Sequence, residues 1–172
     1  SAAMSAAMSA AGSVAKSRGK AVHAACHYLD EGKLDWGTLH PDLHGYVRSW
    51  DAFKSHCGLK ILDMETPRYH PLYLFAGTLD RRVTMPQGGE WILDLKTGPA
   101  PKWGCYQTAA YTLLADNDLG KKPRKRGCVE LHVDGSLATL VPYTGMEQFD
   151  DGLKFLSFLT TCNERRIHGI AD

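Results

Sequence analysis

The sequence lacks the features that define several classes of protein. It has five cysteines but no Cys-x-x-Cys pair, so neither a disulfide framework nor a zinc knuckle is predicted, and a reducing cytoplasm is the expected location. No apolar run approaches the roughly 18 residues needed to cross a bilayer, and the N-terminus lacks the basic-then-apolar order of a secretory signal. We therefore expect a soluble protein that has no membrane partner.

An excess of charge of one sign is also missing, because the formal net charge is only +1. This excludes a uniformly basic protein that coats nucleic acid, but it leaves room for local basic patches. The strongest such patch is a run of five cations within six residues: Lys121, Lys122, Arg124, Lys125 and Arg126. The run alone leaves two interpretations open, a solvated loop and a contact with DNA phosphates.

The chain of 172 residues, 44% of them hydrophobic, is long enough for one substantial core and short for two. We predict a single domain over residues 13–172. Residues 1–12 form an Ala/Ser/Met repeat of low complexity, which is compatible with a helix, a linker or a remnant of protein expression. No function is assigned to that segment.

Hydrophobic periodicity predicts nine elements in the remaining chain. A period near 3.6 predicts helices over residues 13–32, 41–58, 103–116 and 146–167. A period near two, with turns at 86–89 and 134–135, predicts strands over residues 60–69, 72–85, 90–96, 128–133 and 137–142. The order ααβββαββα indicates the α/β class, with a mixed β-sheet flanked by helices.

Polar residues with catalytic potential occur on two consecutive predicted strands. Asp80 ends the segment Gly77–Asp80, and Asp94 is followed two positions later by Lys96. Side chains alternate along a strand, so Lys96 is expected on the same face as Asp94. Two carboxylates can hold a hard divalent cation, while a nearby amine orients a nucleophile or offsets charge on a phosphate. This combination suits phosphodiester hydrolysis with Mg²⁺ or Mn²⁺.

Each of these residues also has an ordinary structural interpretation. Asp80 and Asp94 are also compatible with ion pairs to neighbouring cations of the strands, namely Arg81, Arg82 and Lys96. His23 shares its helix with apolar residues, so a core histidine is the alternative to a metal ligand. Most of the four tryptophans are core candidates, whereas Trp103 follows the catalytic strand and is positioned to stack on a base.

Together these segments resemble the PD-(D/E)XK nuclease superfamily, in particular its RecB-like branch with phage-type exonucleases. The resemblance rests on order as well as identity, and it covers residues 18–111 through five pieces: Arg18-Gly19-x-x-x-His23, Glu65, Gly77-Thr78-Leu79-Asp80, Asp94-Leu95-Lys96-Thr97-Gly98 and Gln107-x-x-x-Tyr111. It implies a restriction-endonuclease-like core. The C-terminal third carries no recognised motif.

The resemblance also assigns roles. It implies metal ligands at His23, Asp80, Asp94 and the Leu95 carbonyl, and a catalytic lysine at Lys96. Glu65 is expected to support the site or a second metal ion. Supporting or DNA-binding roles are expected for Gln107, Tyr111, Arg18, Thr97 and the basic run. The cofactor is one or two Mg²⁺ or Mn²⁺ ions, and no iron–sulfur cluster is expected.

The function implied is a DNA nuclease of the phage or recombination type in a bacterial or phage-infected cell, with an exonuclease favoured. A homo-oligomer and a recombination partner protein are both compatible with that expectation. Two alternatives stay open: a junction-resolving or other structure-specific endonuclease, and a catalytically silent module that binds nucleic acid.

Overall fold

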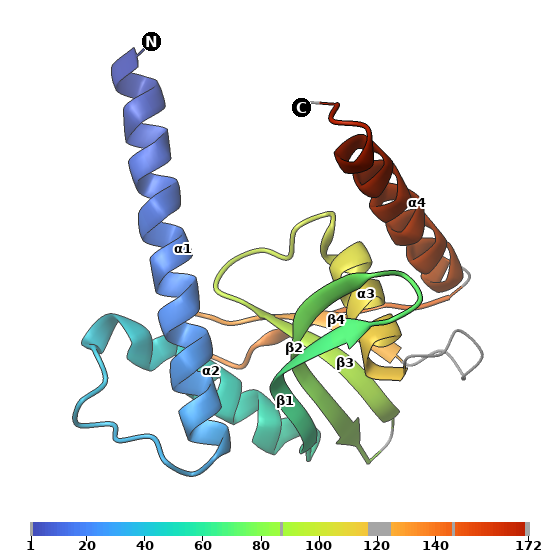
Figure 1. Ribbon diagram of the computed structural model, residues 1–172. Helices are drawn as coiled ribbons and strands as arrows, with labels where there is room; N and C mark the ends of the chain where they lie inside the picture. The colour runs from blue at the N-terminus through green and yellow to red at the C-terminus, as the bar shows by residue number, and fades with distance from the viewer. Residues whose placement is uncertain (1, 87, 117–124, 146, 171–172) are drawn as a thin grey trace.

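A computed structural model describes residues 2–86, 88–116, 125–145 and 147–170 of the chain. Within these ranges the elements follow the predicted order ααβββαββα (Figure 1). Their bounds are α1 (Ala2–Asp30), α2 (Pro41–Cys57), β1 (Lys60–His70), β2 (Phe75–Met85), β3 (Gly89–Lys96), α3 (Gly104–Asp116), β4 (Lys125–Glu130), β5 (Thr139–Tyr143) and α4 (Glu147–Ile167).

The five strands form one mixed sheet in the order β1-β2-β3-β4-β5. All neighbouring pairs are antiparallel except β3 and β4, which run parallel. Parallel neighbours need a crossover connection, and the chain makes it through α3. The predicted fold class, an α/β domain with a mixed sheet flanked by helices, is therefore confirmed.

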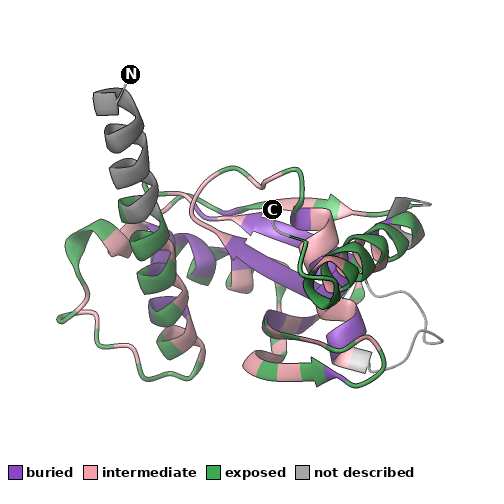
Figure 2. Ribbon diagram, turned by 45° about the horizontal axis from the view of Figure 1, so that its top comes forward, coloured by how far each residue is buried: buried purple, intermediate pink, exposed green. Residues whose placement is uncertain are grey.

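Helices cover both faces of the sheet. On one face, apolar side chains of α1 and α2 pack with alternate residues of β3 and β4, including Leu93, Leu95 and Val129, to form the main core. On the other face, α3 contacts the strands and α4 in turn packs on α3. Figure 2 shows this division, with buried residues concentrated in the central strands while α4 is largely exposed. The catalytic candidates therefore lie on strands that are held from both sides.

Local sequence explains where α2 begins and ends. Pro41 occupies the first turn, where a missing N–H costs nothing, and the His40 side chain accepts a hydrogen bond from the Asp42 amide. Gly58 ends the helix in the left-handed conformation with a φ of 58°, which glycine adopts without a steric penalty. The predicted start at Pro41 and stop at Gly58 are confirmed.

Three elements differ in their bounds from the prediction. Helix α1 begins at Ala2, so the structure shows a helix, one of the interpretations left open for the low-complexity segment, and it continues into the helix predicted from residue 13. Strand β4 spans Lys125–Glu130 instead of 128–133, because its charged first residues were assigned to the basic run. Strand β5 is displaced by one or two residues in the opposite direction, to Thr139–Tyr143 instead of 137–142.

The position of β4 corrects the interpretation of Arg126 as a DNA contact. Its side chain is only 2% exposed, and its Nη2 atom lies 2.8 Å from Asp151 Oδ2 of α4. Its Nη1 atom donates to the Cys105 carbonyl of α3 at 2.6 Å. Arg126 therefore ties β4 to two helices and cannot belong to an exposed basic surface. Lys125 is exposed, whereas Lys121, Lys122 and Arg124 lie outside the described residues.

The cysteines are all free in the structure, and their environments differ. Cys26 and Cys128 are buried, whereas Cys162 is exposed on α4. Burial raises the pKa of the Cys26 thiol to about 12 and that of Cys128 to about 11. A search of the helices in the described ranges found none with the length and apolar character required to span a membrane.

Candidate metal and catalytic site

The site forms where β2 and β3 separate. Their backbone pairing ends with Arg81 opposite Leu93. Beyond this pair the Leu95 amide donates to the Asp80 side chain, with a distance of 2.9 Å to Oδ2, and not to a backbone carbonyl of β2. The divergence leaves room at the strand ends while the Asp80 side chain stays fixed and buried.

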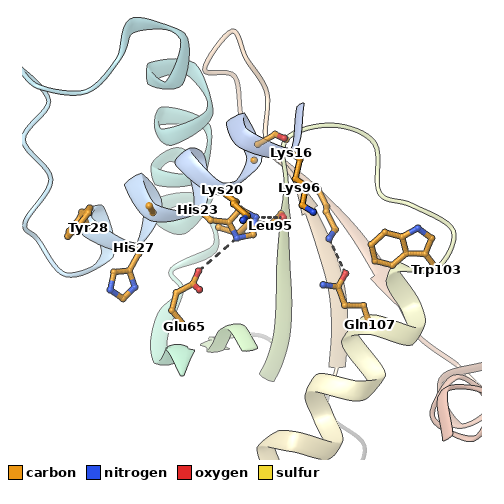
Figure 3. A pocket seen from close by; sticks show the side chains of 13 residues that line it. Lys16, Lys20, His23, His27, Tyr28, Glu65, Leu95, Lys96, Trp103 and Gln107 are labelled. Atoms are coloured by element: carbon orange, nitrogen blue, oxygen red, sulfur yellow. Dashed lines mark hydrogen bonds and ion pairs between the residues drawn. The ribbon is translucent and has the colours of Figure 1, made fainter. Parts of the chain in front are cut away.

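His23 reaches this point from α1. Its Nε2 atom lies 2.8 Å from the Leu95 carbonyl oxygen (Figure 3). Its Nδ1 atom lies 3.4 Å from Asp80 Oδ2. The ring therefore bridges the backbone of β3 and the carboxylate of β2. The two atoms that the resemblance names as neighbouring metal ligands, His23 nitrogen and Leu95 oxygen, are in direct contact.

Glu65 completes a group of three side chains that can act as metal ligands. Met64 pairs with Arg81 and Thr66 with Leu79, which places Glu65 across from Asp80. The Glu65 backbone has a φ of 48°, a left-handed conformation that costs a non-glycine residue roughly 1–2 kcal/mol. Such strain occurs preferentially at functional sites. Ligand atoms of His23, Glu65 and Asp80 all lie within 4.8 Å of one another.

Asp94 and Lys96 form the adjacent half of the site. Lys96 Nζ lies 2.5 Å from Asp94 Oδ2, so the expectation that the two side chains share a face is met. Lys96 also donates to Gln107 Oε1 of α3 at 3.0 Å, and Gln107 Nε2 donates to the Tyr111 hydroxyl at 2.6 Å. Gln107 and Tyr111 lie one helical turn apart on α3, which covers the face of the sheet opposite α1 and α2. From there they position Lys96.

Burial and mutual charge control the protonation of the two aspartates. Burial and, after it, the negative charge of Asp80 together raise the pKa of Asp94 to about 7, although Lys96 offsets part of their effect. Burial also acts to raise the pKa of Asp80, but hydrogen bonds from His23 and the Leu95 amide outweigh it, so the pKa is lowered. The negative charge of one carboxyl group therefore affects the pKa of the other, as expected for two groups in one site.

Protonation of His23 follows from the same contacts. Burial acts to lower the pKa of His23, but the hydrogen bond and charge of Asp80 outweigh that effect and the pKa is raised. The Asp80 carboxylate therefore favours the protonated form of the His23 ring.

A buried ion pair beneath the site was not predicted from the sequence. The Arg81 side chain is fully buried, and its Nε atom donates to Asp30 Oδ2 at 2.8 Å, while Nη1 donates to Glu65 Oε1 at 3.2 Å. Asp30 is held in addition by Trp50 and Lys54. Arg81 thus holds Glu65 and forms no ion pair with the carboxylates of Asp80 or Asp94, although its Nη1 atom also donates to the Asp80 backbone carbonyl at 2.8 Å. The available signal was the alternation that places Arg81 between Leu79 and Val83, two apolar residues of the same strand.

The site opens into a pocket of about 860 Å³ between α1 and the segment that leads from β3 into α3 (Figure 3). Residues already predicted for the site line it, including His23, Glu65, Lys96 and Thr97. Sequence reasoning missed Lys16, Lys20 and His27, which line the same pocket from α1 at helical spacing.

Arg18 is not among the residues that line this pocket. Its guanidinium carbon lies 5.9 Å from the centre of the Tyr46 ring, so the side chain packs against α2. Arg18 therefore joins α1 to α2, and the structure provides no contact between it and the candidate catalytic residues.

No protein-family model matches the chain, and no curated protein is significantly similar to it. The function must therefore be inferred from the site itself.

The residues present fit a divalent cation. His23, Glu65 and Asp80 offer one imidazole nitrogen and two carboxylates within a small volume, and the Leu95 carbonyl adjoins them. Carboxylate and carbonyl oxygens suit Mg²⁺ and Mn²⁺, and imidazole is more typical of transition metals, so the mixed set favours Mn²⁺. Asp94 lies outside the group of three, and its carboxylate contacts Lys96.

Proposed function

We propose that the protein is a metal-dependent nuclease that hydrolyses DNA phosphodiester bonds. One observation carries the proposal: a group of three metal-ligand side chains, His23, Glu65 and Asp80, adjoins the Asp94–Lys96 pair. The two aspartates are buried, whereas His23, Glu65 and Lys96 line an open pocket. A purely structural ion pair needs neither the neighbouring ligand group nor access from solvent.

The residues of the site would have distinct roles in hydrolysis. His23, Glu65 and Asp80 would hold the cation, with Asp94 and the Leu95 carbonyl beside them. When bound, the cation supplies polarisation of a phosphoryl oxygen and of the attacking water. Lys96, held by Asp94 and Gln107, is positioned to orient that water or to offset charge that develops on the phosphate. No covalent enzyme intermediate is involved.

DNA is the proposed substrate because the pocket has lysine side chains around a candidate metal site, and both attract the phosphates of a nucleic acid. Lys16 and Lys20 on α1 and Lys96 on β3 place positive charge around the pocket. The order of motifs that resembles the PD-(D/E)XK superfamily supports the same substrate, and its phage-type branch favours an exonuclease. The choice of an exonuclease rests on that analogy alone.

The test is cleavage of end-labelled linear DNA with Mg²⁺ or Mn²⁺, with and without a chelator. The variant Lys96→Ala should reduce the cleavage rate by at least roughly 100-fold, because an acid–base or electrostatic group is lost at the reacting phosphate. Circular dichroism should show an unchanged fold. The matched control is Lys154→Ala, an exposed lysine on α4, which should cleave at the wild-type rate.

Full activity in a folded Lys96→Ala protein would contradict the proposed mechanism. Wild-type protein that binds DNA but cleaves no substrate with either metal would identify a silent binding module instead. A closed circular substrate separates the remaining alternatives, since an exonuclease leaves it intact and an endonuclease, including a junction-resolving one, requires no end.

A further inference from the structure

The pocket has two unlike sides. On α1, Lys16 and Lys20 are one helical turn apart, exposed, and followed on the same face by His23. In the described part of the chain neither lysine forms an ion pair. On the opposite side, the indole of Trp103 stands at the start of α3 (Figure 3). Lys96 lies beside the Trp103 ring, and His23 and Glu65 line the same pocket.

Trp103 differs from the buried tryptophans of this protein. Its side chain is 56% exposed, whereas Trp50 and Trp91 belong to the core. An indole contributes to the core by removing its large apolar surface from water, and more than half of Trp103 stays exposed. Packing therefore does not account for its position.

The segment that carries Trp103 is nevertheless held in place. The Ala100 amide donates to Glu130 Oε1 at 2.6 Å, and the Gly104 amide donates to the Pro101 carbonyl at 2.8 Å. Lys96 Nζ lies 5.2 Å from the centre of the indole ring. The ring is therefore a fixed platform next to the candidate catalytic lysine, and an ammonium ion over one face leaves the other face for a ligand.

We propose that Trp103 stacks on an unpaired base of the DNA strand next to the phosphate being cleaved, while Lys16 and Lys20 bind phosphates of the same strand. The site therefore takes single-stranded DNA or the frayed end of a duplex. This inference rests on the proposed nuclease function and deepens it by naming the form of the substrate.

The chemistry of stacking selects the unpaired form. Every base has a π-face, so an aromatic platform accepts any sequence, but a base inside a duplex has both faces covered by its neighbours. Presenting a face to Trp103 from within a duplex costs a few kcal/mol of unstacking and unpairing. A single strand or a frayed end avoids most of that cost.

Binding is tested first, without cleavage. Oligothymidylate is titrated into the protein with Ca²⁺ in place of Mg²⁺, and intrinsic tryptophan fluorescence is followed while gel analysis verifies that the oligonucleotide stays intact. Quenching should arise mainly from Trp103 and disappear in Trp103→Phe, which should retain its affinity by anisotropy. Trp103→Ala should bind at least roughly fivefold more weakly, as expected for the loss of one stacked base.

The lysines are tested through salt dependence. In Lys16→Ala/Lys20→Ala, the slope of log affinity against log salt for the same oligonucleotide should fall by roughly 1.4, because two single-strand phosphate contacts are lost. The control Lys60→Ala/Lys154→Ala removes two exposed lysines from β1 and α4, so net charge is matched. Its slope should equal that of the wild type. Equal slopes in the two double variants would overturn the role of the α1 lysines.

Removal of a base then tests the contact during cleavage. An abasic residue beside the cleaved bond should slow wild-type cleavage at least roughly fivefold and should not slow Trp103→Ala further. Equal slowing of both proteins would overturn the stacking proposal. A wild-type protein that cleaves no DNA would instead contradict the proposed function, and the fluorescence titration would still decide whether Trp103 binds an unpaired base.

Discussion

Asp94 is the residue at which stability and proposed function oppose each other. Its side chain is 1% exposed, and burial together with Asp80 raises its pKa to about 7. The pKa in the unfolded chain is near 3.8, so the folded protein binds this proton more tightly. The resulting stabilisation is complete below that value and is lost as the pH rises through about 7.

The first prediction follows from this opposition. At pH 8 in a chelator, Asp94→Asn should unfold at a temperature at least about 2 °C higher than the wild type, because a buried charge that repels Asp80 is removed. The same variant should lose cleavage and most of the stabilisation by Mn²⁺. Differential scanning calorimetry at pH 5 and pH 8 measures both effects, and the advantage of the variant should shrink at pH 5. A variant less stable than the wild type at pH 8 would show that the buried charge of Asp94 does not destabilise the folded protein.

Single-residue reasoning from the sequence succeeded where strand alternation applied. Lys96 meets Asp94 because i and i+2 share a face. It could not place Arg81 against Asp30, because these residues are 51 positions apart and their contact depends on how α1 docks. Nor could it reveal the left-handed backbone of Glu65, since no glycine marks that position. The catalytic roles assigned to these residues stay predictions.

At the scale of elements, α2 is positioned by a close backbone approach. A Cβ atom added to Gly45 would lie 1.6 Å from the Val133 carbonyl oxygen in the turn between β4 and β5. Backbone atoms cannot rotate away as a flexible side chain can, so only glycine lets the helix and the turn meet at this distance. The contact also helps to hold α2 against the core that supports β3.

The second prediction compares two helical glycines. Gly45→Ala should lower the free energy of unfolding by roughly 3 kcal/mol or more, the upper range for overpacking. Gly152→Ala in α4 should raise it by roughly 0.5–1 kcal/mol, because an added Cβ there meets nothing within 4 Å and alanine favours the helix. Urea unfolding measures both. A Gly45→Ala protein as stable as the wild type would mean that α2 does not approach the turn this closely.

Element type and order were predictable because each element carries a clear hydrophobic period. Boundaries failed where charge obscured that period. Strand β4 begins with Lys125 and Arg126, and a buried arginine is acceptable there because of tertiary partners such as Asp151, 25 positions away. A local pattern contains no information about such a partner, so the strand was assigned to the residues that follow.

At the scale of the molecule, the architecture brings distant segments to one point. Residues of α1, β1, β2 and β3 meet at His23, Glu65, Asp80 and Leu95, and α3 adds Gln107 from the other face. The mixed sheet was predictable from the order of elements. The pocket was not, because it depends on the angle at which α1 crosses the strand ends, and therefore Lys16 and Lys20 were missed.

The proposed function requires a divalent cation bound at the divergence of β2 and β3. Anomalous diffraction from crystals grown with Mn²⁺ measures this directly. We expect one strong peak bonded to Asp80 and to at least two of His23, Glu65, Asp94 and the Leu95 carbonyl, and no such peak in Asp80→Asn crystals. Saturating Mn²⁺ with no peak at this position in the wild-type protein would contradict it.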